Sequence, residues 1–210
     1  MAEPKNLITP LHQQTRRDCL ARMSDDKVAC MKVAREYGAD YWDGDRRFGY
    51  GGYRYDGRWK PVAERIIDEY ELPQSGARIL DMGCGKAHLL YELDKLLDDA
   101  EVVGCDISQH ALDDVPVEIR SKCFLQRAQD PYPFEDDAFD LVISVGTLHN
   151  LTLPDLSTAL GEIERVGKQK FVLVESYRDQ AELFNLQCWA LTCESFLRPE
   201  EWRFAFDAFG

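Results

Sequence analysis

The chain has 210 residues, of which 45% are hydrophobic and 30% charged, and its formal net charge is −13. This length allows one sizeable hydrophobic core and is small for two. The negative charge disfavours nucleic acids and anionic membranes as partners, and the sequence shows neither an apolar run of membrane-spanning length nor the layout of a signal peptide. We therefore expect a cytoplasmic protein with no nucleic-acid partner and no membrane partner.

The seven cysteines are scattered, without C-x-x-C spacing. Reduced thiols in a core are the ordinary interpretation of this pattern in a cytoplasmic protein. Cys188 and Cys193 lie in a segment of helical pattern without a neighbouring histidine. We expect no metal site.

Residues 1–60 are expected to form an N-terminal arm, a helix and an aromatic lid loop. The first 24 residues are polar and irregular, and we interpret them as an arm or a loosely packed helix. Residues 25–37 have the pattern of a short amphipathic helix. Residues 40–59, "DYWDGDRRFGYGGYRYDGRW", show no regular period, but their aromatic content indicates an ordered loop. Four arginines, Arg46, Arg47, Arg54 and Arg58, leave room for a local anion pocket in this acidic chain.

Residues 61–210 have the pattern of one α/β domain, and Pro61 suits the first turn of its opening helix. The expected strands are 77–82, 101–107, 122–127, 139–146 and 170–177. The expected later helices are 87–97, 109–115, 153–166, 180–193 and 199–209. Because the strands alternate with helices, we expect a parallel sheet that is covered on both faces.

The stretch "ILDMGCGKAHLL" (79–90) places Gly83 and Gly85 where the first strand ends. Ligands of open parallel sheets bind outside the carboxyl ends of the strands. Glycine allows a tight turn and a close approach of a ligand to the backbone, and the turn also presents free N–H groups at the start of a helix. The alternative is a tight strand–helix turn that holds no ligand.

Two ligand classes use such a turn. A dinucleotide fold would have a third glycine where this chain has His88, and the sequence has no recognisable Tyr-x-x-x-Lys pair, so NAD is disfavoured. The run Asp81-Met82-Gly83-Cys84-Gly85-Lys86-Ala87 instead resembles the D-x-G-x-G-x-G motif of class I S-adenosylmethionine-dependent methyltransferases, with Ala87 in place of the last glycine. The resemblance covers residues 78–177 and includes "YPFEDDAFDLVISVG" (132–146). "FGYGGYRYDGRW" and "LTCESF" resemble small bacterial members.

The resemblance implies a Rossmann-like α/β fold in which residues 61–210 bind S-adenosyl-L-methionine. Asp106 would hold the ribose hydroxyls, although aspartate also suits a helix cap. Where family members carry an adenine acceptor, this chain has Arg127, which has no acceptor atom. Either the backbone or a neighbouring residue would then serve adenine. The cofactor-binding residues that the resemblance implies are Asp81, Gly83, Cys84, Gly85, Asp106, Ile107, Ala128, Gln129 and Val145.

His149 and Glu175 are the candidate catalytic residues, since each follows or ends a strand at the edge where methyl donor and acceptor would meet. His149 would remove a proton from a hydroxyl or an amine, or it is a polar residue satisfied at a strand end, and Glu175 faces a similar choice. The candidate substrate and lid residues are Tyr50, Tyr53, Arg58, Trp59 and Tyr177. The aromatic ones would cover the site or pack the extension onto the domain, and Arg58 would bind an anion or form a surface salt bridge.

We expect methyl transfer to oxygen or nitrogen of a small molecule, such as a sugar-type metabolite. Neither an N-P-P-Y tetrapeptide nor a Pro-Cys motif of nucleic-acid methylation is present. The alternative is a catalytically weak methyltransferase-like binding module or partner subunit, which Ala87 and Arg127 favour.

The end of the sequence carries a further expectation. Class I methyltransferases close their sheet with a hairpin, but nothing β-like follows the expected strand 170–177. We expect that the closing strands are missing. The chain would then derive from a longer protein, or a neighbouring subunit, as in a homodimer, or the N-terminal arm would cover the open edge.

Overall fold

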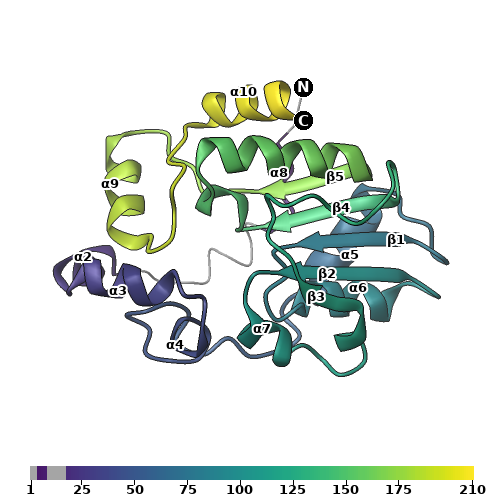
Figure 1. Cartoon of the computed structure of the whole chain (residues 1–210), viewed down its shortest axis with the longest axis horizontal. Coiled ribbons are helices and arrows are strands. Elements are labelled where there is room, and N and C mark those ends of the chain that lie inside the picture. Colours follow the sequence, from purple (N-terminus) through teal and green to yellow (C-terminus); the bar gives the residue numbers. More distant parts are fainter. Residues whose placement is uncertain (1–3, 9–17) are drawn as a thin grey trace.

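The computed structural model describes residues 4–8 and 18–210. Its centre is a sheet of five parallel strands in the order β3-β2-β1-β4-β5 (Figure 1). The strands are β1 (Arg78–Met82), β2 (Glu101–Asp106), β3 (Cys123–Leu125), β4 (Phe139–Val145) and β5 (Gly167–Leu173). The strand order reverses between β1 and β4, which is the position at which such sheets bind ligands.

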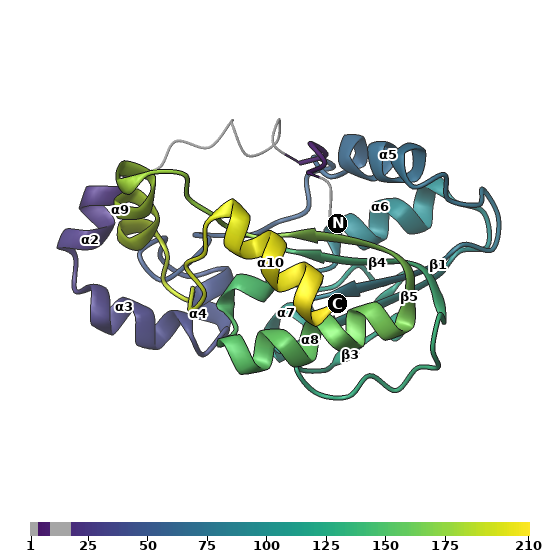
Figure 2. The same ribbon diagram turned by 90° about the horizontal axis from the view of Figure 1, so that it is seen from above.

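Helices cover both faces of the sheet. In Figure 2, α5 and α6 lie on one side of the strands and α8 on the other, and α10 packs against α8. The helices of this domain are α5 (Lys60–Glu69), α6 (His88–Leu96), α7 (Gln109–Asp113), α8 (Leu153–Val166), α9 (Gln180–Trp189) and α10 (Pro199–Phe209). Before them lie α2 (Cys19–Ser24), α3 (Lys27–Ala34) and α4 (Ala39–Trp42), and single 3₁₀ turns span Arg120–Lys122 and Leu148–Asn150.

The strands divide their side chains between two cores, because successive residues of a strand point to opposite faces. Ile79 packs with α5 and α6, whereas the next residue, Leu80, packs with α8. Leu7 and Ile8 join the first core, although they are far from it in sequence. Both faces of the sheet are therefore apolar, as the hydrophobic strands predict.

The N-terminal helices lie beyond the carboxyl ends of the strands. In Figure 1 the strand arrows point towards α2, α3, α4 and α9. Helix α2 packs against α9, and the Nζ atom of Lys27 donates hydrogen bonds to the carbonyls of Gln187 (3.0 Å) and Cys188. Two segments that are far apart in the sequence thus enclose the edge of the sheet where a ligand is expected.

The predicted fold class is confirmed, and the five expected strands are all present. Several expected bounds differ from the structure, and two of the differences concern predicted site residues or cysteines. Strand β5 ends at Leu173 rather than at residue 177, because its partner β4 ends at Val145 and the chain turns at Gly146 (φ 72°). Glu175 and Tyr177 therefore follow the strand. Helix α9 ends at Trp189, because Ala190 is extended, so Cys193 is not helical.

Between residues 18 and 210 no strand follows β5, and its hydrogen-bonded neighbour is β4 alone. The Oη atom of Tyr70 donates to the carbonyl of Lys170 at 3.1 Å, so the C-cap residue of α5 contacts this edge strand. In the part of the chain that the structure describes, the helices are too short or too polar to cross a bilayer. The arm predicted for residues 1–24 lies partly outside the described residues.

Candidate functional site

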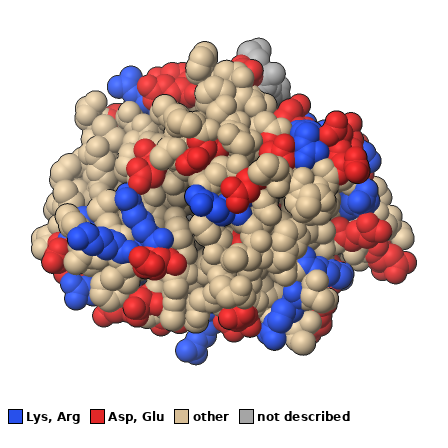
Figure 3. All heavy atoms as spheres, viewed as in Figure 1, with Lys and Arg blue, Asp and Glu red and all other residues tan. Residues whose placement is uncertain are grey.

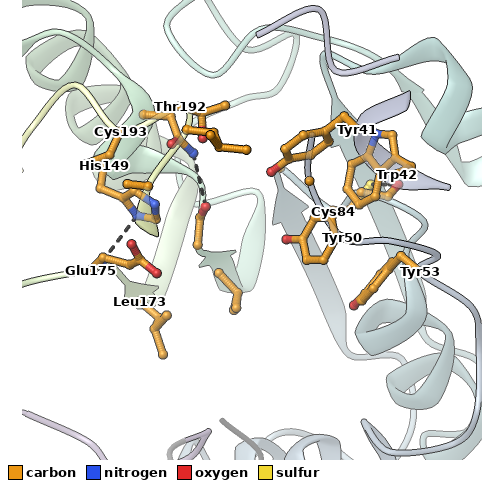
Figure 4. Close-up of a pocket in the computed structure, with 18 of the residues that line it drawn as sticks. Tyr41, Trp42, Tyr50, Tyr53, Cys84, His149, Leu173, Glu175, Thr192 and Cys193 are labelled. Atoms are coloured by element: carbon orange, nitrogen blue, oxygen red, sulfur yellow. Dashed lines mark hydrogen bonds between the residues drawn. The ribbon is translucent and has the colours of Figure 1, made fainter. Parts of the chain in front are cut away.

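A pocket of about 1110 Å³ lies at the carboxyl ends of β1, β4 and β5. Figure 4 shows its two walls. His149, Glu175, Leu173, Thr192 and Cys193 form one wall, and Tyr41, Trp42, Tyr50 and Tyr53 form the other. Cys84, from the turn after β1, lies beside the aromatic wall. The pocket therefore brings the N-terminal segment and the segment after β5 to the same strand ends.

The turn between β1 and α6 requires backbone conformations that favour glycine. Gly83 has φ +82°, and a Cβ atom there would lie 2.0 Å from the Oγ1 atom of Thr147. Gly85 has φ +56°, and its Cβ would lie 2.7 Å from the ring of Trp42. Ala87 adopts φ +55° at the position where the family motif has glycine. The glycine-like backbone of the motif is thus kept despite the alanine.

Asp81 is a buried carboxyl group at the floor of the pocket, with only 4% of its surface exposed. Within residues 4–8 and 18–210, its Oδ1 atom has no hydrogen-bond partner. Burial raises the pKa of Asp81 to about 7, and the nearby Asp106 adds to the rise. A buried polar atom without a partner costs free energy. The residues at this end of the pocket thus fit the amino-acid part of a ligand that carries an ammonium group.

Asp106 is placed differently, since it is 7% exposed and does not line the pocket. Its carboxylate accepts hydrogen bonds from the backbone N–H groups of Gly85 and Ser108, both at 2.7 Å. Burial raises the pKa of Asp106, and these hydrogen bonds oppose the rise. The N-cap of α7 is Ser108, whose Oγ atom accepts from the N–H of Ala111. Asp106 therefore holds the turn, and it does not cap that helix.

Trp42 covers this closed end. Its indole contacts the position of Gly85, and its Nε1–H donates to the carbonyl of Tyr37 (3.1 Å) and to the Oγ atom of Ser108 (2.9 Å). Tyr50 stacks on Trp42 with ring centroids 5.1 Å apart and an angle of 9°. The aromatic segment thereby occupies the space beside Asp106.

An ion pair fastens this segment to the turn. The Nζ atom of Lys86 contacts Asp43 at 2.7 Å and Asp114 at 2.8 Å, and the lysine side chain is 1% exposed. His88 of α6 stacks on Tyr53 at 4.8 Å, and burial lowers the pKa of His88 to about 4. His88, which stands where a dinucleotide-binding motif has its third glycine, therefore packs against the aromatic wall.

Three residues that the resemblance implies as cofactor-binding, Ile107, Ala128 and Gln129, lie outside the pocket. Ile107 is exposed at the surface, and Ala128 packs in the core on the α8 side of the sheet. Gln129 and Arg127 contact each other at 2.7 Å, once the side-chain amide of Gln129 is oriented so that its oxygen accepts from the guanidinium. Ile107, Ala128 and Gln129 therefore do not line the pocket, and their role in cofactor binding stays a prediction.

His149 lies in the 3₁₀ turn after β4 and is 6% exposed. Its Nδ1 atom accepts a hydrogen bond from the backbone N–H of Glu175 at 3.3 Å (Figure 4). The proton of a neutral imidazole must therefore reside on Nε2, which makes that atom a donor. Burial lowers the pKa of His149, and Glu175 partly opposes this change. The geometry thus suits His149 as a hydrogen-bond donor better than as a base.

The remaining lid residues make contacts of their own. Arg58 forms an ion pair with Asp56, and the Nε1–H of Trp59 donates to the Oη atom of Tyr53 at 2.9 Å. Tyr177 is buried and does not line the pocket. The predicted residues that the pocket brings together are Asp81, Gly83, Cys84, Gly85, Val145, His149, Glu175, Tyr50, Tyr53, Arg58 and Trp59.

Arg22 is a lining residue that sequence reasoning missed. It donates to the carbonyls of Trp189 (3.4 Å) and Gly49 (3.1 Å), and its guanidinium lies 3.9 Å from the centre of the Trp189 ring. This arginine joins α2, α9 and the aromatic segment. An arginine in a polar N-terminal stretch gives no sequence signal for such a role.

Comparison with known proteins identifies the family to which most of this chain is similar. A family model described as a methyltransferase domain matches residues 73–203. The mitochondrial arginine-hydroxylase NDUFAF5 of Mus musculus is 32% identical over 141 residues, which cover 64% of this chain and 39% of that protein. An uncharacterised methyltransferase of Synechocystis is 31% identical over 111 residues, which cover 52% of this chain and 51% of that one.

Among solved structures, the YcgJ protein of Bacillus subtilis has the same fold, with a TM-score of 0.56 and 19% identity. The match covers 70% of this chain and 66% of that one. The chain spans about two fifths of the length of the NDUFAF5 relatives that it matches.

Proposed function

This chain belongs to the methyltransferase-domain family and has the fold of the class I S-adenosylmethionine-dependent methyltransferases, and on that premise we propose that it is a small-molecule methyltransferase. It would bind S-adenosyl-L-methionine at the β1–α6 turn and transfer the methyl group to oxygen or nitrogen of its acceptor. The observation that carries this proposal is the unpartnered carboxylate oxygen of Asp81 beside the glycine turn.

The cofactor supplies, when bound, a methyl group on a positively charged sulfonium. The residues that would hold it are Asp81 and the turn Gly83-Cys84-Gly85, with Val145 on the neighbouring strand. Asp81 would accept hydrogen bonds from the ammonium group, and the turn lets the ligand approach the backbone. The aromatic wall would exclude water from the strand ends. Alignment of reacting groups alone contributes about 7–11 kcal/mol in favourable systems.

Two residues on the opposite wall would handle the acceptor. The carboxylate of Glu175 is a hydrogen-bond acceptor that lines the pocket, so it is the better candidate for the base. His149 would donate a hydrogen bond from Nε2 to the acceptor and orient it. The backbone fixes His149 on both sides, because its own carbonyl accepts from the N–H groups of Glu194 (3.0 Å) and Ser195 (2.9 Å).

The acceptor is proposed to be a small molecule such as a sugar-type metabolite. The pocket has room for one beside the cofactor, and arginines as well as carboxylates line it. On the face seen in Figure 3, Lys and Arg side chains lie among Asp and Glu side chains, so that face offers no basic surface for a nucleic acid. The proposal includes four further expectations. They are a cytoplasmic location, the absence of nucleic-acid and membrane partners, a homodimer, and the division of the chain into segments 1–60 and 61–210.

The second candidate is a methyltransferase-like binding module. The surroundings of Asp106 favour the binding module. The carboxylate that was expected to hold the ribose hydroxyls already accepts hydrogen bonds from two backbone N–H groups of the protein. A relative named as an arginine-hydroxylase also indicates that members of this family differ in activity.

Calorimetric titration with S-adenosylmethionine, S-adenosylhomocysteine and NAD separates these proposals. We expect the first two to bind and NAD not to bind. Absence of binding by both adenosyl ligands would contradict the methyltransferase and leave only a partner subunit that holds no cofactor. Binding without methyl transfer to any member of a panel of hydroxyl- and amine-bearing metabolites would favour the binding module.

The division of roles between Glu175 and His149 has its own test with the acceptor that the panel identifies. Glu175→Gln should lower turnover by about 100-fold or more, the lower range for loss of a general base. His149→Gln keeps an N–H donor and should lower turnover less than tenfold. If His149→Gln abolished turnover and Glu175→Gln did not, the roles would have to be exchanged.

A further inference from the structure

Two thiols meet beneath the glycine turn. Cys84 lies between Gly83 and Gly85, and Cys123 opens β3, where it is the register partner of Gly104 on β2. A Cβ atom on Gly104 would lie 2.7 Å from the Sγ atom of Cys123 and 3.0 Å from the Sγ atom of Cys84. Both sulfur atoms therefore occupy the space that the missing side chain of Gly104 leaves, and they are near neighbours.

The two sulfur atoms also interact. The neighbouring thiol of Cys84 lowers the pKa of Cys123, whereas Cys123, together with burial, raises the pKa of Cys84 well above its ordinary value. In the structure the Sγ–H of Cys84 donates to the carbonyl of Gly85 at 3.7 Å. A thiol that lies beside another sulfur and can donate to it stabilises the thiolate form of that neighbour. Both cysteines are free and only partly buried, and Cys84 lines the pocket. Cys123 is thus the more nucleophilic member and Cys84 the natural second member.

We propose that Cys84 and Cys123 form a redox-sensitive pair that a peroxide converts to a disulfide at the floor of the cofactor pocket. The thiolate of Cys123 attacks one oxygen of hydrogen peroxide, which gives a sulfenic acid and releases hydroxide. The sulfur of Cys84 then attacks the sulfenic sulfur, and water leaves. The net reaction consumes two thiols and one peroxide and gives one disulfide and two waters.

The disulfide would act on the cofactor site. It would tie the Gly83–Gly85 turn to β3 and replace the free thiol of Cys84 with a cross-link. This consequence rests on the proposed function, whereas formation of the bond does not. The two are therefore tested with different measurements.

Bond formation is tested on the reduced full chain with a small excess of hydrogen peroxide, followed by intact-mass measurement and peptide mapping. We expect a loss of about two mass units, a linked peptide that joins Cys84 to Cys123, and recovery of the original mass with a reductant. Cys84→Ser and Cys123→Ser should not lose this mass. Cys19→Ser is the matched control, because Cys19 is also partly buried but lies on α2, and it should still lose the mass.

Several outcomes would overturn the inference. They are a gain of oxygen atoms on either cysteine without a cross-link, a link between another pair such as Cys84 and Cys105, and loss of two mass units in both serine variants. Because Cys123→Ser could fail to fold, Cys123→Ala with a circular dichroism spectrum serves as a second variant. Titration of the oxidised and reduced wild type with S-adenosylhomocysteine then tests the consequence, and we expect at least tenfold weaker binding after oxidation. If the disulfide forms but the reduced chain binds no adenosyl ligand, the proposed function fails and the thiol pair stands.

Discussion

The two acidic residues at the ends of β1 and β2 differ in what surrounds them. Asp81, on β1, faces the pocket with one oxygen that has no hydrogen-bond partner among the described residues. Asp106, one strand away, accepts two backbone hydrogen bonds and lies under the aromatic segment with Trp42. We call the Asp81 end of the site open, because one carboxylate oxygen there lacks a hydrogen-bond partner in the described part of the chain. We call the Asp106 end closed, because the protein's own groups satisfy its carboxylate and Trp42 covers it.

This difference indicates which end of the pocket contributes more to the free energy of ligand binding. At the open end a ligand removes a cost that the folded chain already bears, because a buried unpaired carboxylate is destabilising. At the closed end a ligand must displace an indole that makes two hydrogen bonds and a ring stack. We therefore expect the Asp81 end to dominate affinity and the Trp42 end to control entry.

The largest expected effect comes from removing the charge at the open end. Asp81→Asn should weaken the binding of S-adenosylhomocysteine by about 1.5–3 kcal/mol, the scale of a hydrogen bond to a charged group. Calorimetric titration measures this change. The matched control is Asp140→Asn on β4, an aspartate that pairs with Lys168 away from the pocket and should bind normally. Equal affinity of wild type and Asp81→Asn would remove the distinction between the two ends.

The pH dependence of binding sharpens the same point. The pKa of Asp81 is raised to about 7, and the ligand's ammonium group binds the ionised form. Affinity should therefore rise by about tenfold from pH 6 to pH 8, following the ionised fraction of a group with that pKa. Titrations at several pH values measure the profile. The rise should be absent in Asp81→Asn, and a flat profile in wild type would show that Asp81 is not the group that binds the ammonium.

Stability without ligand should change in the opposite direction to binding. The folded chain holds the proton of Asp81 up to about pH 7, whereas the unfolded chain releases it near the ordinary value of 3.8. In that window the folded state binds more protons, so the contribution of Asp81 to stability falls as the pH rises. The gain in the free energy of unfolding from Asp81→Asn should be about 2–3 kcal/mol larger at pH 8 than at pH 5, because about two pKa units of the shift lie between these pH values and each unit corresponds to about 1.4 kcal/mol. Denaturant titrations at both pH values test this, and a destabilised variant at pH 8 would contradict it.

The smallest expected effect concerns the closed end. Trp42→Ala removes the indole that lies over Gly85, so S-adenosylhomocysteine should associate severalfold faster, with a smaller gain in affinity. Stopped-flow fluorescence of the remaining tryptophans measures the rate. Trp59→Ala serves as the control, because Trp59 lines the pocket but donates its hydrogen bond to Tyr53. Slower association in Trp42→Ala would mean that the indole supports the bound ligand rather than blocking it.

The turn at the open end could be predicted from the sequence because its signals are local. A strand, two glycines and a helix within twelve residues define the β1–α6 turn, and Asp81 precedes it directly. Ala87 takes the left-handed conformation of the glycine that it replaces. The family resemblance is confirmed, and so is the order of strands and helices. Each of these elements could be recognised from the spacing of apolar residues within its own segment.

The closed end could not be predicted because it depends on contacts between distant residues. The hydrogen bond between Trp42 and Ser108 spans 66 positions, and the one between Ser108 and Tyr37 spans 71. Likewise, residues 25–37 were predicted to contain a short amphipathic helix, and α3 forms there with Cys30 and Ala34 buried, whereas Val28 is exposed. Which face of a short helix is buried depends on what packs against it, and its own sequence does not contain that information.

The most direct test of the central claim is the crystal structure of the full chain with S-adenosylhomocysteine. We predict that the ammonium group of the ligand contacts Asp81 and that Trp42 has moved from Gly85, which lets the ribose hydroxyls reach Asp106. A complex in which the ligand leaves Asp81 unpaired, or in which Trp42 keeps its hydrogen bond to Ser108 while ribose occupies the pocket elsewhere, would contradict this account of the two ends.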